Sequence, residues 1–245
     1  LKDEEYINSH YVIMATKKGQ VKKTSLEQYS RPRTNGINAI TIKEGDELLA
    51  AKLTTGDSQV MLAVKSGKAI RFEEEKTRPM GRNASGVRGI TLADDNDEVI
   101  GMVAVNDSES NILVVSENGY GKRSLVEDYR VTNRGGKGVK TISVTEKTGN
   151  LVAINNVTDE DDLMIINKSG IAIRMEVSEL RVMGRATQGV RLINLKGDDA
   201  IAAVAKVKQD EDNVEELEHE AEIEEDQSKK AMENLGTDVE NDSEE

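Results

Sequence analysis

Two sets of glycines recur at the same interval along this chain. Successive members of the first set are 48, 52 and 51 residues apart, and those of the second set are 50, 52 and 51 apart. Because two independent landmarks share one period, the sequence predicts four structural repeats, which bury their apolar faces by stacking on one another. The first set is Gly19, Gly67, Gly119 and Gly170, and the second is Gly36, Gly86, Gly138 and Gly189.

Each repeat contains four segments of strand length. The run before the first glycine is almost continuously apolar, which favours a strand covered on both faces, and the glycine supplies the positive φ that a hairpin turn requires. Four strands per repeat predict an all-β, propeller-like array of four-stranded blades. The predicted strands are 11–16, 59–64, 111–116 and 162–167 before the first glycine, 68–72 and 171–175 after it, 87–92, 139–144 and 190–195 after the second glycine, and 47–51, 98–103, 151–154 and 200–204 at the end of each repeat.

The charge of the chain is concentrated at its end. Residues 208–245 carry 17 acidic and 3 basic residues, a net charge of −14, whereas the whole chain carries −13. A block of like charge without aromatic residues cannot bury enough surface to fold, so this segment is predicted to be an acidic disordered tail. The predicted domains are a truncated loop of a preceding blade at 1–9, blades at 10–57, 58–109, 110–160 and 161–207, and the tail at 208–245. We interpret the chain as a fragment of a longer protein.

Composition excludes several kinds of site. Cysteine is absent, so neither disulfides nor thiolate metal sites can form, and a reducing cytosol suits the chain. No apolar run is long enough to predict a membrane span. His10 and His219 are far apart in the sequence, and no nucleophile and base stand together. We therefore predict no catalytic residue and no metal site.

Basic residues recur at equivalent positions of the repeats. Lysine or arginine stands four positions after the first glycine in all four copies, and arginine stands eleven or twelve positions after it. A ring of stacked blades places equivalent positions at equivalent radii, so recurring cations predict a belt that follows a phosphate backbone. Arginine also forms bidentate contacts with phosphate. The candidate DNA-binding residues are Lys22, Lys23, Arg31, Arg33, Arg71, Arg78, Arg82, Arg88, Lys122, Arg123, Arg130, Arg134, Lys137, Lys140, Arg174, Arg181, Arg185 and Arg191.

Several stretches carry a resemblance to a known family. They are Met14-Ala15-Thr16-Lys17-Lys18-Gly19, Arg78-Pro79-Met80-Gly81-Arg82, Asn118-Gly119-Tyr120-Gly121-Lys122-Arg123 and Val182-Met183-Gly184-Arg185. With the glycines that follow them, they resemble the C-terminal domain of DNA gyrase A over about residues 5–207. The resemblance implies a β-pinwheel of which this chain holds roughly the last four blades, with duplex DNA wrapped around a basic rim. It also implies a bacterial, cytoplasmic, nucleoid-associated protein.

The chain departs from the family at one motif. The family's signature box, Gln-Arg-Arg-Gly-Gly-Lys-Gly, belongs to the first blade of the family, whereas residues 132–138 keep only its last five residues and lie in a later blade. The resemblance therefore implies DNA contact for Arg134 and Lys137, but not the special role of the box in completing the wrap.

The resemblance also implies partners and limits. The chain would be the non-catalytic, DNA-wrapping part of an ATP-dependent type II DNA topoisomerase that introduces negative supercoils. It would act with the rest of the gyrase A polypeptide and with the gyrase B polypeptide in a heterotetramer, and ATP and Mg²⁺ would bind elsewhere in that enzyme. Two alternatives stay open: the C-terminal domain of a topoisomerase IV polypeptide, and a propeller-like protein-interaction module. A further hypothesis is that the acidic tail competes with DNA for the basic belt.

Overall fold

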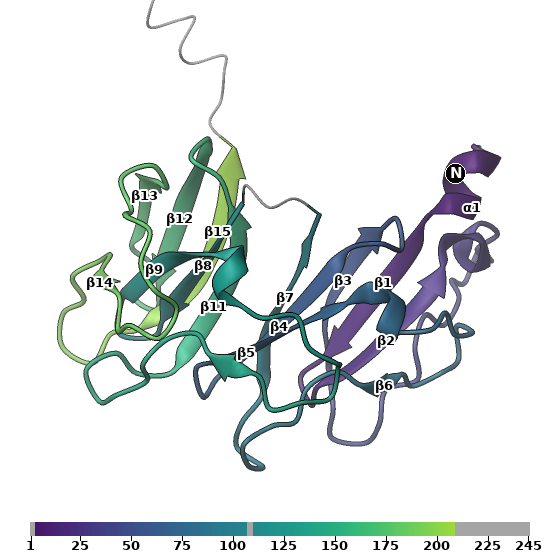
Figure 1. Cartoon of the computed structure of the whole chain (residues 1–245), viewed down its shortest axis with the longest axis horizontal. Coiled ribbons are helices and arrows are strands. Elements are labelled where there is room, and N and C mark those ends of the chain that lie inside the picture. The colour runs from purple at the N-terminus through teal and green to yellow at the C-terminus, as the bar shows by residue number, and fades with distance from the viewer. Residues whose placement is uncertain (1–2, 107–109, 209–245) are drawn as a thin grey trace, which may run out of the picture. The chain divides into compact units, whose positions relative to one another are not determined.

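The computed structural model describes residues 3–106 and 110–208, so the predicted disordered tail lies outside the described residues from position 209 onward. Leu1–Val207 form one compact unit. Apart from α1 (Glu4–Ser9) and three single 3-10 turns, the regular elements of the described residues are all β-strands, which confirms the predicted all-β class (Figure 1). None of the helices described is long and apolar enough to cross a membrane.

The repeats share one order of elements: a hairpin of two strands, a single 3-10 turn in the first three repeats, a loop, a short strand in the last three repeats, and a long strand. The first repeat holds β1 (Tyr11–Thr16), β2 (Gln20–Ser25), η1 (Leu26–Tyr29) and β3 (Leu48–Thr54). The second holds β4 (Gln59–Val64), β5 (Lys68–Glu73), η2 (Glu74–Lys76), β6 (Val87–Arg88) and β7 (Val99–Val105). The third holds β8 (Asn111–Ser116), β9 (Tyr120–Leu125), η3 (Val126–Asp128), β10 (Val139–Lys140) and β11 (Leu151–Val157). The fourth holds β12 (Asp161–Asn167), β13 (Ala172–Glu176), β14 (Val190–Arg191) and β15 (Ile201–Lys208).

The strands of a repeat do not all belong to one sheet. The antiparallel sheets have the orders β3-β1-β2-β6, β10-β5-β4-β7 and β11-β8-β9-β14, so the fourth strand of each is donated by the following repeat (Figure 1). This exchange was not predicted. The last sheet, β13-β12-β15, has three strands among the described residues, and residues 37–42 of the first repeat form no strand.

The second glycine of the second, third and fourth repeats makes this exchange possible. Gly86 has a φ of +90°, and a Cβ atom on it would lie 2.4 Å from the carbonyl oxygen of Val21 in the preceding sheet. A Cβ atom on Gly138 would likewise lie 2.5 Å from the carbonyl oxygen of Ala69. Only glycine can bring the chain so close to a neighbouring backbone. The donated strands are two residues long rather than the predicted six.

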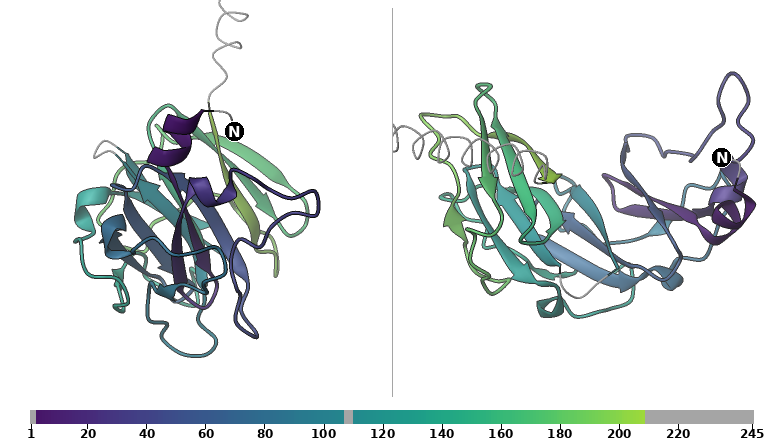
Figure 2. Two further views of the ribbon diagram at one scale, coloured as in Figure 1. Left: turned by 90° about the vertical axis from the view of Figure 1, so that its right-hand side faces the viewer. Right: turned by 90° about the horizontal axis from the view of Figure 1, so that it is seen from above.

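Each hydrophobic core is shared by two neighbouring repeats. One cluster joins Ile13 and Val21 of the first repeat to Leu62, Ile70 and Phe72 of the second. Two further clusters join the second repeat to the third and the third to the fourth. The sheets accordingly follow one another in the order of the sequence in the right view of Figure 2. Burial between repeats, rather than within them, is what the predicted stacking required.

A short helix lies within the segment that was predicted to be a loop. It is α1 (Glu4–Ser9), whose N-cap residue Asp3 accepts a 3.1 Å hydrogen bond from the amide of Tyr6 through its side chain. Asp is among the residues that best satisfy the free amides at a helix start. Ile7 is buried and fixes one face of this short helix against the repeat that follows.

Candidate nucleic-acid interface

Three of the four cations that stand four positions after the first glycine point into the contacts between repeats. The ammonium group of Lys23 lies 2.9 Å from a carboxylate oxygen of Glu74 in the next repeat, and both side chains are buried. The same ammonium group donates to the carbonyl oxygen of Gly56 at 3.2 Å and lies 4.2 Å from the ring centre of Tyr11. The charge of Lys23 is therefore already engaged within the protein and is not offered to a phosphate.

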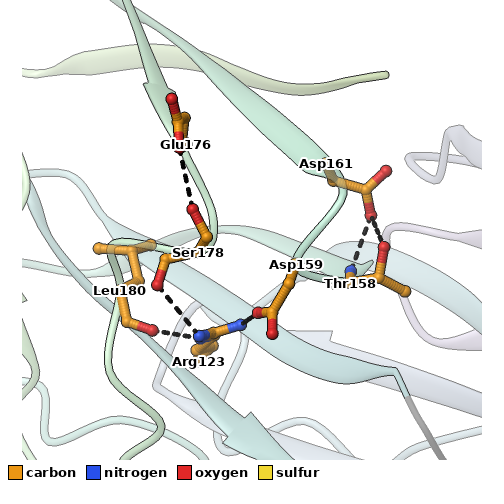
Figure 3. A network of polar contacts seen from close by, with 7 residues as sticks. All are labelled: Arg123, Thr158, Asp159, Asp161, Glu176, Ser178 and Leu180. Atoms are coloured by element: carbon orange, nitrogen blue, oxygen red, sulfur yellow. Dashed lines mark hydrogen bonds and ion pairs between the residues drawn. The ribbon is translucent and has the colours of Figure 1, made fainter. Parts of the chain in front are cut away.

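Arg71 and Arg123 repeat this arrangement at the next two contacts. Nη1 of Arg71 donates to the carbonyl oxygens of Val126 and Tyr129, at 2.7 and 3.0 Å. Arg123 donates to the carbonyl oxygen of Leu180 and pairs with Asp159, and its Nη2 lies 3.4 Å from the carbonyl oxygen of Ser178 (Figure 3). These side chains hold the turn that follows the hairpin of the next repeat.

The expected outer belt therefore fails at three of its four positions. Arg174, the fourth, is exposed, and its Nε donates to the carboxylate of Asp162 in the same repeat at 2.6 Å. The described chain offers no further repeat beyond it for a guanidinium to hold. The fixed period predicted that these cations occupy the same place in each repeat. It did not specify whether that place is at the outer surface or inside the contact between two repeats.

Lys22 and Lys122 are buried beneath the loop of the following repeat. Nζ of Lys22 donates to the carbonyl oxygen of Ala39, at 2.5 Å, and to that of Arg82. Nζ of Lys122 donates to the carbonyl oxygen of Gly184 at 2.6 Å. Burial disfavours the charged form and lowers the pKa of each lysine to about 8. The ammonium groups of both lysines are therefore bonded within the protein and not exposed to solvent.

The next set of arginines is held at matching places on the outside. Arg78, Arg130 and Arg181 are exposed, and the residue after each forms a parallel bridge to Lys23, Arg71 or Arg123 of the preceding repeat. The amide two positions after each arginine donates to the carbonyl oxygen of that same cation of the preceding repeat, at 2.7, 2.8 and 2.8 Å. The cations at the repeat contacts thus fix the backbone from which the exposed arginines project. Arg31, the member from the first repeat, is also exposed.

The arginines four positions before the second glycine clamp two repeats together. Nε and Nη1 of Arg134 donate to the carbonyl oxygens of Lys76 and Arg88, at 2.9 and 3.0 Å. Arg185 makes the equivalent bonds to Asp128 and Lys140, at 2.9 and 2.8 Å. Arg82 donates to the carbonyl oxygen of Asn38 at 3.2 Å. All three are half-buried, so each presents only part of its guanidinium to solvent.

A second exposed set lies on the donated strands. Arg88, Lys140 and Arg191 are the last residues of β6, β10 and β14, and each stands opposite a residue of the accepting hairpin. Lys140 stands opposite Lys68, a like-charged pair that is unfavourable unless an anion lies near it. Lys68 was not among the predicted residues, although its place directly after a first glycine is where a hairpin strand begins.

Arg191 and Tyr120 form a contact of their own. Nη2 of Arg191 donates to the phenol oxygen of Tyr120 at 2.8 Å, and this bond lowers the pKa of Tyr120 from its ordinary value. The guanidinium and the ammonium group of Lys147 lie 5.4 and 5.3 Å from the centre of the tyrosine ring. Lys147 is a second cation that the sequence reasoning did not single out.

The predicted residues thus divide by exposure. Lys22, Lys23, Lys122 and Arg123 are buried, and Arg71, Arg82, Arg134 and Arg185 are half-buried and bonded to protein. The exposed residues are Arg31, Arg33, Arg78, Arg88, Arg130, Lys137, Lys140, Arg174, Arg181 and Arg191. Among the described residues no group of histidine or acidic side chains is arranged to hold a metal ion.

Comparison with known proteins finds one family along the whole array. The profile described as DNA gyrase C-terminal domain, beta-propeller, matches residues 10–55, 59–106, 110–158 and 161–208. The DNA gyrase A protein of Staphylococcus aureus strain MRSA252 is 49% identical over 204 residues, and that of strain NCTC 8325 is 49% identical over 202. These alignments cover 83% and 82% of this chain but 23% of each relative, so the chain spans about a quarter of their length.

Two solved structures have a similar fold. The C-terminal domain of DNA topoisomerase IV superposes with a TM-score of 0.80 at 22% identity, covering 90% of this chain and 69% of that one. The DNA gyrase A C-terminal domain superposes with a TM-score of 0.72 at 23% identity, covering 83% of this chain and 68% of that one. Both support the fold.

Proposed function

Since this chain belongs to the DNA gyrase C-terminal domain family, we propose that it binds duplex DNA and bends it along the exposed cations of its repeats. The observation that carries the proposal is the recurrence of two exposed basic positions at successive repeat contacts. One is the loop position of Arg78, Arg130 and Arg181, and the other is the strand position of Arg88, Lys140 and Arg191.

The proposed contact set is smaller than the sequence suggested. It leaves out the buried cations, whose charged groups are bonded to the protein, and it treats the half-buried arginines as supports. Seven exposed residues at recurring positions are the proposed phosphate contacts: Arg31, Arg78, Arg130, Arg181, Arg88, Lys140 and Arg191. Neutralising about seven phosphates predicts that log K falls with log salt concentration with a slope of about −6.

The energetics make the proposed wrapping sensitive to salt. Non-specific binding with a Kd of about 10⁻⁴–10⁻⁶ M corresponds to about 5–8 kcal/mol. Bending 20–30 base pairs by 40–90° costs about 1–6 kcal/mol, so the gross attraction to phosphate has to exceed the net affinity by that amount. A modest rise in ionic strength then removes the bend before it removes all binding.

The remaining functional assignments follow from the family. The chain would act as the non-catalytic, DNA-wrapping part of the gyrase A polypeptide, with the gyrase B polypeptide as a further partner, in the bacterial cytoplasm. ATP and Mg²⁺ would bind to other parts of that enzyme. In the assembled enzyme, bent DNA would return over the site of strand passage, which is how a bend in one domain supports negative supercoiling.

The test separates binding from wrapping. Mobility shift with random-sequence duplex over a range of salt concentrations measures the slope. Relaxation of a closed circular plasmid by a type I topoisomerase in the presence of the chain, followed by removal of protein, measures the change in linking number. We expect a slope of about −6 and a linking-number distribution displaced in one direction. A slope near zero contradicts the proposal, and binding without displacement contradicts wrapping.

A further inference from the structure

The three contacts between neighbouring repeats differ at one buried position. Three places after the first glycine, the first and third repeats have Lys22 and Lys122, each bonded to a carbonyl oxygen of the loop that covers it. The second repeat has Ile70 at this place, and the loop of residues 132–138 lies over it. The side chain of Ile70 can donate no hydrogen bond, so at this second contact the loop lies over an apolar side chain.

A pocket with a volume of about 240 Å³ opens at the second contact. It is formed by the hairpin strand of the second repeat and the loop of the third, and its lining includes Ile70, Arg71, Arg130, Gly136 and Lys137. Three of these residues are basic, and no acidic residue lines it. By contrast, the pocket beside Tyr120 and the pocket beside Asp94 are both lined by several carboxylates.

Two cations of this pocket are available. Arg130 and Lys137 are exposed, and within the described residues neither side chain has a hydrogen-bond or ion-pair partner. Arg71 forms the inner wall, with Nε and Nη1 already bonded to Gln59, Val126 and Tyr129. The loop itself is fixed from the far side, because Thr91 donates through its hydroxyl to the carbonyl oxygen of Gly135 at 2.7 Å and through its amide to that of Gly136 at 2.9 Å.

We propose that this pocket between the second and third repeats binds a phosphate group, held by Arg130 and Lys137. Cations grouped around a cavity with no competing carboxylate match a tetrahedral dianion or diester, and arginine can bind two of its oxygens at once. At about 30 Å³ for each water, the cavity has room for a phosphate and several waters. The phosphate comes either from the DNA backbone, in which case the inference rests on the proposed function, or from a free phosphate.

The first arm of the test uses inorganic phosphate and the whole chain, followed through backbone amide NMR signals. Lys137→Gln introduces the residue found at the equivalent place of the fourth repeat, Gln188. Gly136→Thr introduces the equivalent Thr187 and narrows the cavity without changing charge. Gly136 has no positive φ, and a Cβ atom on it would make ordinary contacts at 3.5 and 3.9 Å, so this variant is expected to fold.

For the native chain we expect saturable shifts of the amide signals that are confined to residues around the pocket. In both variants we expect phosphate to bind at least about tenfold more weakly, because Lys137→Gln removes a charge-assisted hydrogen bond and Gly136→Thr narrows the cavity. Lys52→Gln, which removes an exposed cation on β3 away from the pocket, should leave phosphate binding unchanged. Non-saturating shifts spread over all exposed lysines and arginines, unaltered in the two pocket variants, would overturn the proposal.

The second arm measures affinity for a 20-base-pair duplex. If DNA supplies the phosphate, Gly136→Thr weakens duplex binding although it changes no charge. If the variants lose inorganic phosphate and keep duplex affinity, the pocket takes free phosphate and the DNA source is rejected. A wild-type chain that binds phosphate in the pocket but no duplex would refute the proposed function and leave the pocket standing. A wild-type chain that binds duplex but not inorganic phosphate would refute the phosphate pocket and leave the proposed function standing.

Discussion

The ammonium group of Lys122 donates a 2.6 Å hydrogen bond to the carbonyl oxygen of Gly184, which lies 62 positions later in the chain. Lys22 makes the same bond to Arg82, 60 positions later. Neither lysine is at the surface, yet each lies under a loop that carries an exposed arginine. Buried and exposed cations thus have different tasks in one repeat: the buried ones position the loop, and the exposed ones face solvent.

Replacing Lys122 with isoleucine, the residue at the equivalent place in the second and fourth repeats, should change how stability depends on pH. The folded pKa of Lys122 is lowered from 10.5 to about 8, so between these values the unfolded state binds more protons. Stability of the native sequence should therefore rise through this range, by about 1–3 kcal/mol from this group. Urea unfolding of both proteins at several pH values measures the difference in their unfolding free energies. This difference reports on Lys122 alone, because the other titrating groups are present in both proteins. A difference constant between pH 7.5 and 10.5 would contradict the assignment.

Replacing Lys23 with methionine should be strongly destabilising. Glu74 is fully buried, and loss of its cation leaves a carboxylate without a partner of opposite charge, at a cost of about 3–5 kcal/mol. The double variant Lys23→Met with Glu74→Gln should recover part of this loss because the charge is gone. Urea unfolding measures both, and Arg78→Ala serves as a surface control expected to stay within about 0.5 kcal/mol of the native protein. Equal stabilities for the single and double variants would show that the ion pair does not hold the contact.

Replacing Arg78 with alanine should weaken DNA binding without affecting the fold. The residue is exposed and belongs to the recurring loop position, so its loss should reduce the slope of log K against log salt by about 1. The matched control is Lys52→Ala, an exposed cation on β3, which is the edge strand opposite β6 in the same sheet. Salt-dependent mobility shift compares the two. Equal losses would mean that DNA is attracted by overall charge rather than by the proposed rim.

Removing residues 208–245 should tighten DNA binding at low salt if the acidic segment competes for the same cations. The segment 208–245 has a net charge of −14 while the remainder of the chain is close to neutral, so the repeats alone repel DNA much less. The effect should fade as salt screens both attractions, over a Debye length of about 10 Å at 0.1 M. The truncated and complete chains are compared by mobility shift at two salt concentrations. An affinity that does not change at low salt would count against competition.

Much of the fold could be predicted because its signals are local. Apolar runs of strand length, hairpin glycines and a fixed period are written in consecutive residues, and the four hairpins lie where they were expected. The exchange of β6, β10 and β14 could not be predicted in this way, because a short strand carries the same residues whether it joins its own hairpin or that of a neighbour. The close approach of Gly86 to the carbonyl oxygen of Val21 is visible only when the two are placed together.

Lys23, Arg71 and Arg123 point into the contacts between repeats instead of outward, and the reason is physical. Recurrence at equal spacing is equally expected of residues that bind the next repeat and of residues that face outward. One sequence signal could have separated them: Lys22 and Lys23 are adjacent on a strand, as are Lys122 and Arg123, and neighbouring side chains of a strand point to opposite faces. Both members of such a pair cannot lie on one solvent-exposed face. The isoleucines at the places equivalent to Lys22 marked that face as interior.

The donated strands give this chain two kinds of boundary that do not coincide. One boundary is the end of a repeat in the sequence. The other is the end of a hydrogen-bonded sheet, which lies further along the chain, after the Val-Arg or Val-Lys pair that the next repeat donates. A gene that gains or loses one copy at the sequence boundary consequently alters two sheets rather than one. The exchange of strands therefore makes it difficult to add or remove a single repeat. It also means that a donated strand and the sheet that accepts it have to stay compatible as the two neighbouring repeats evolve.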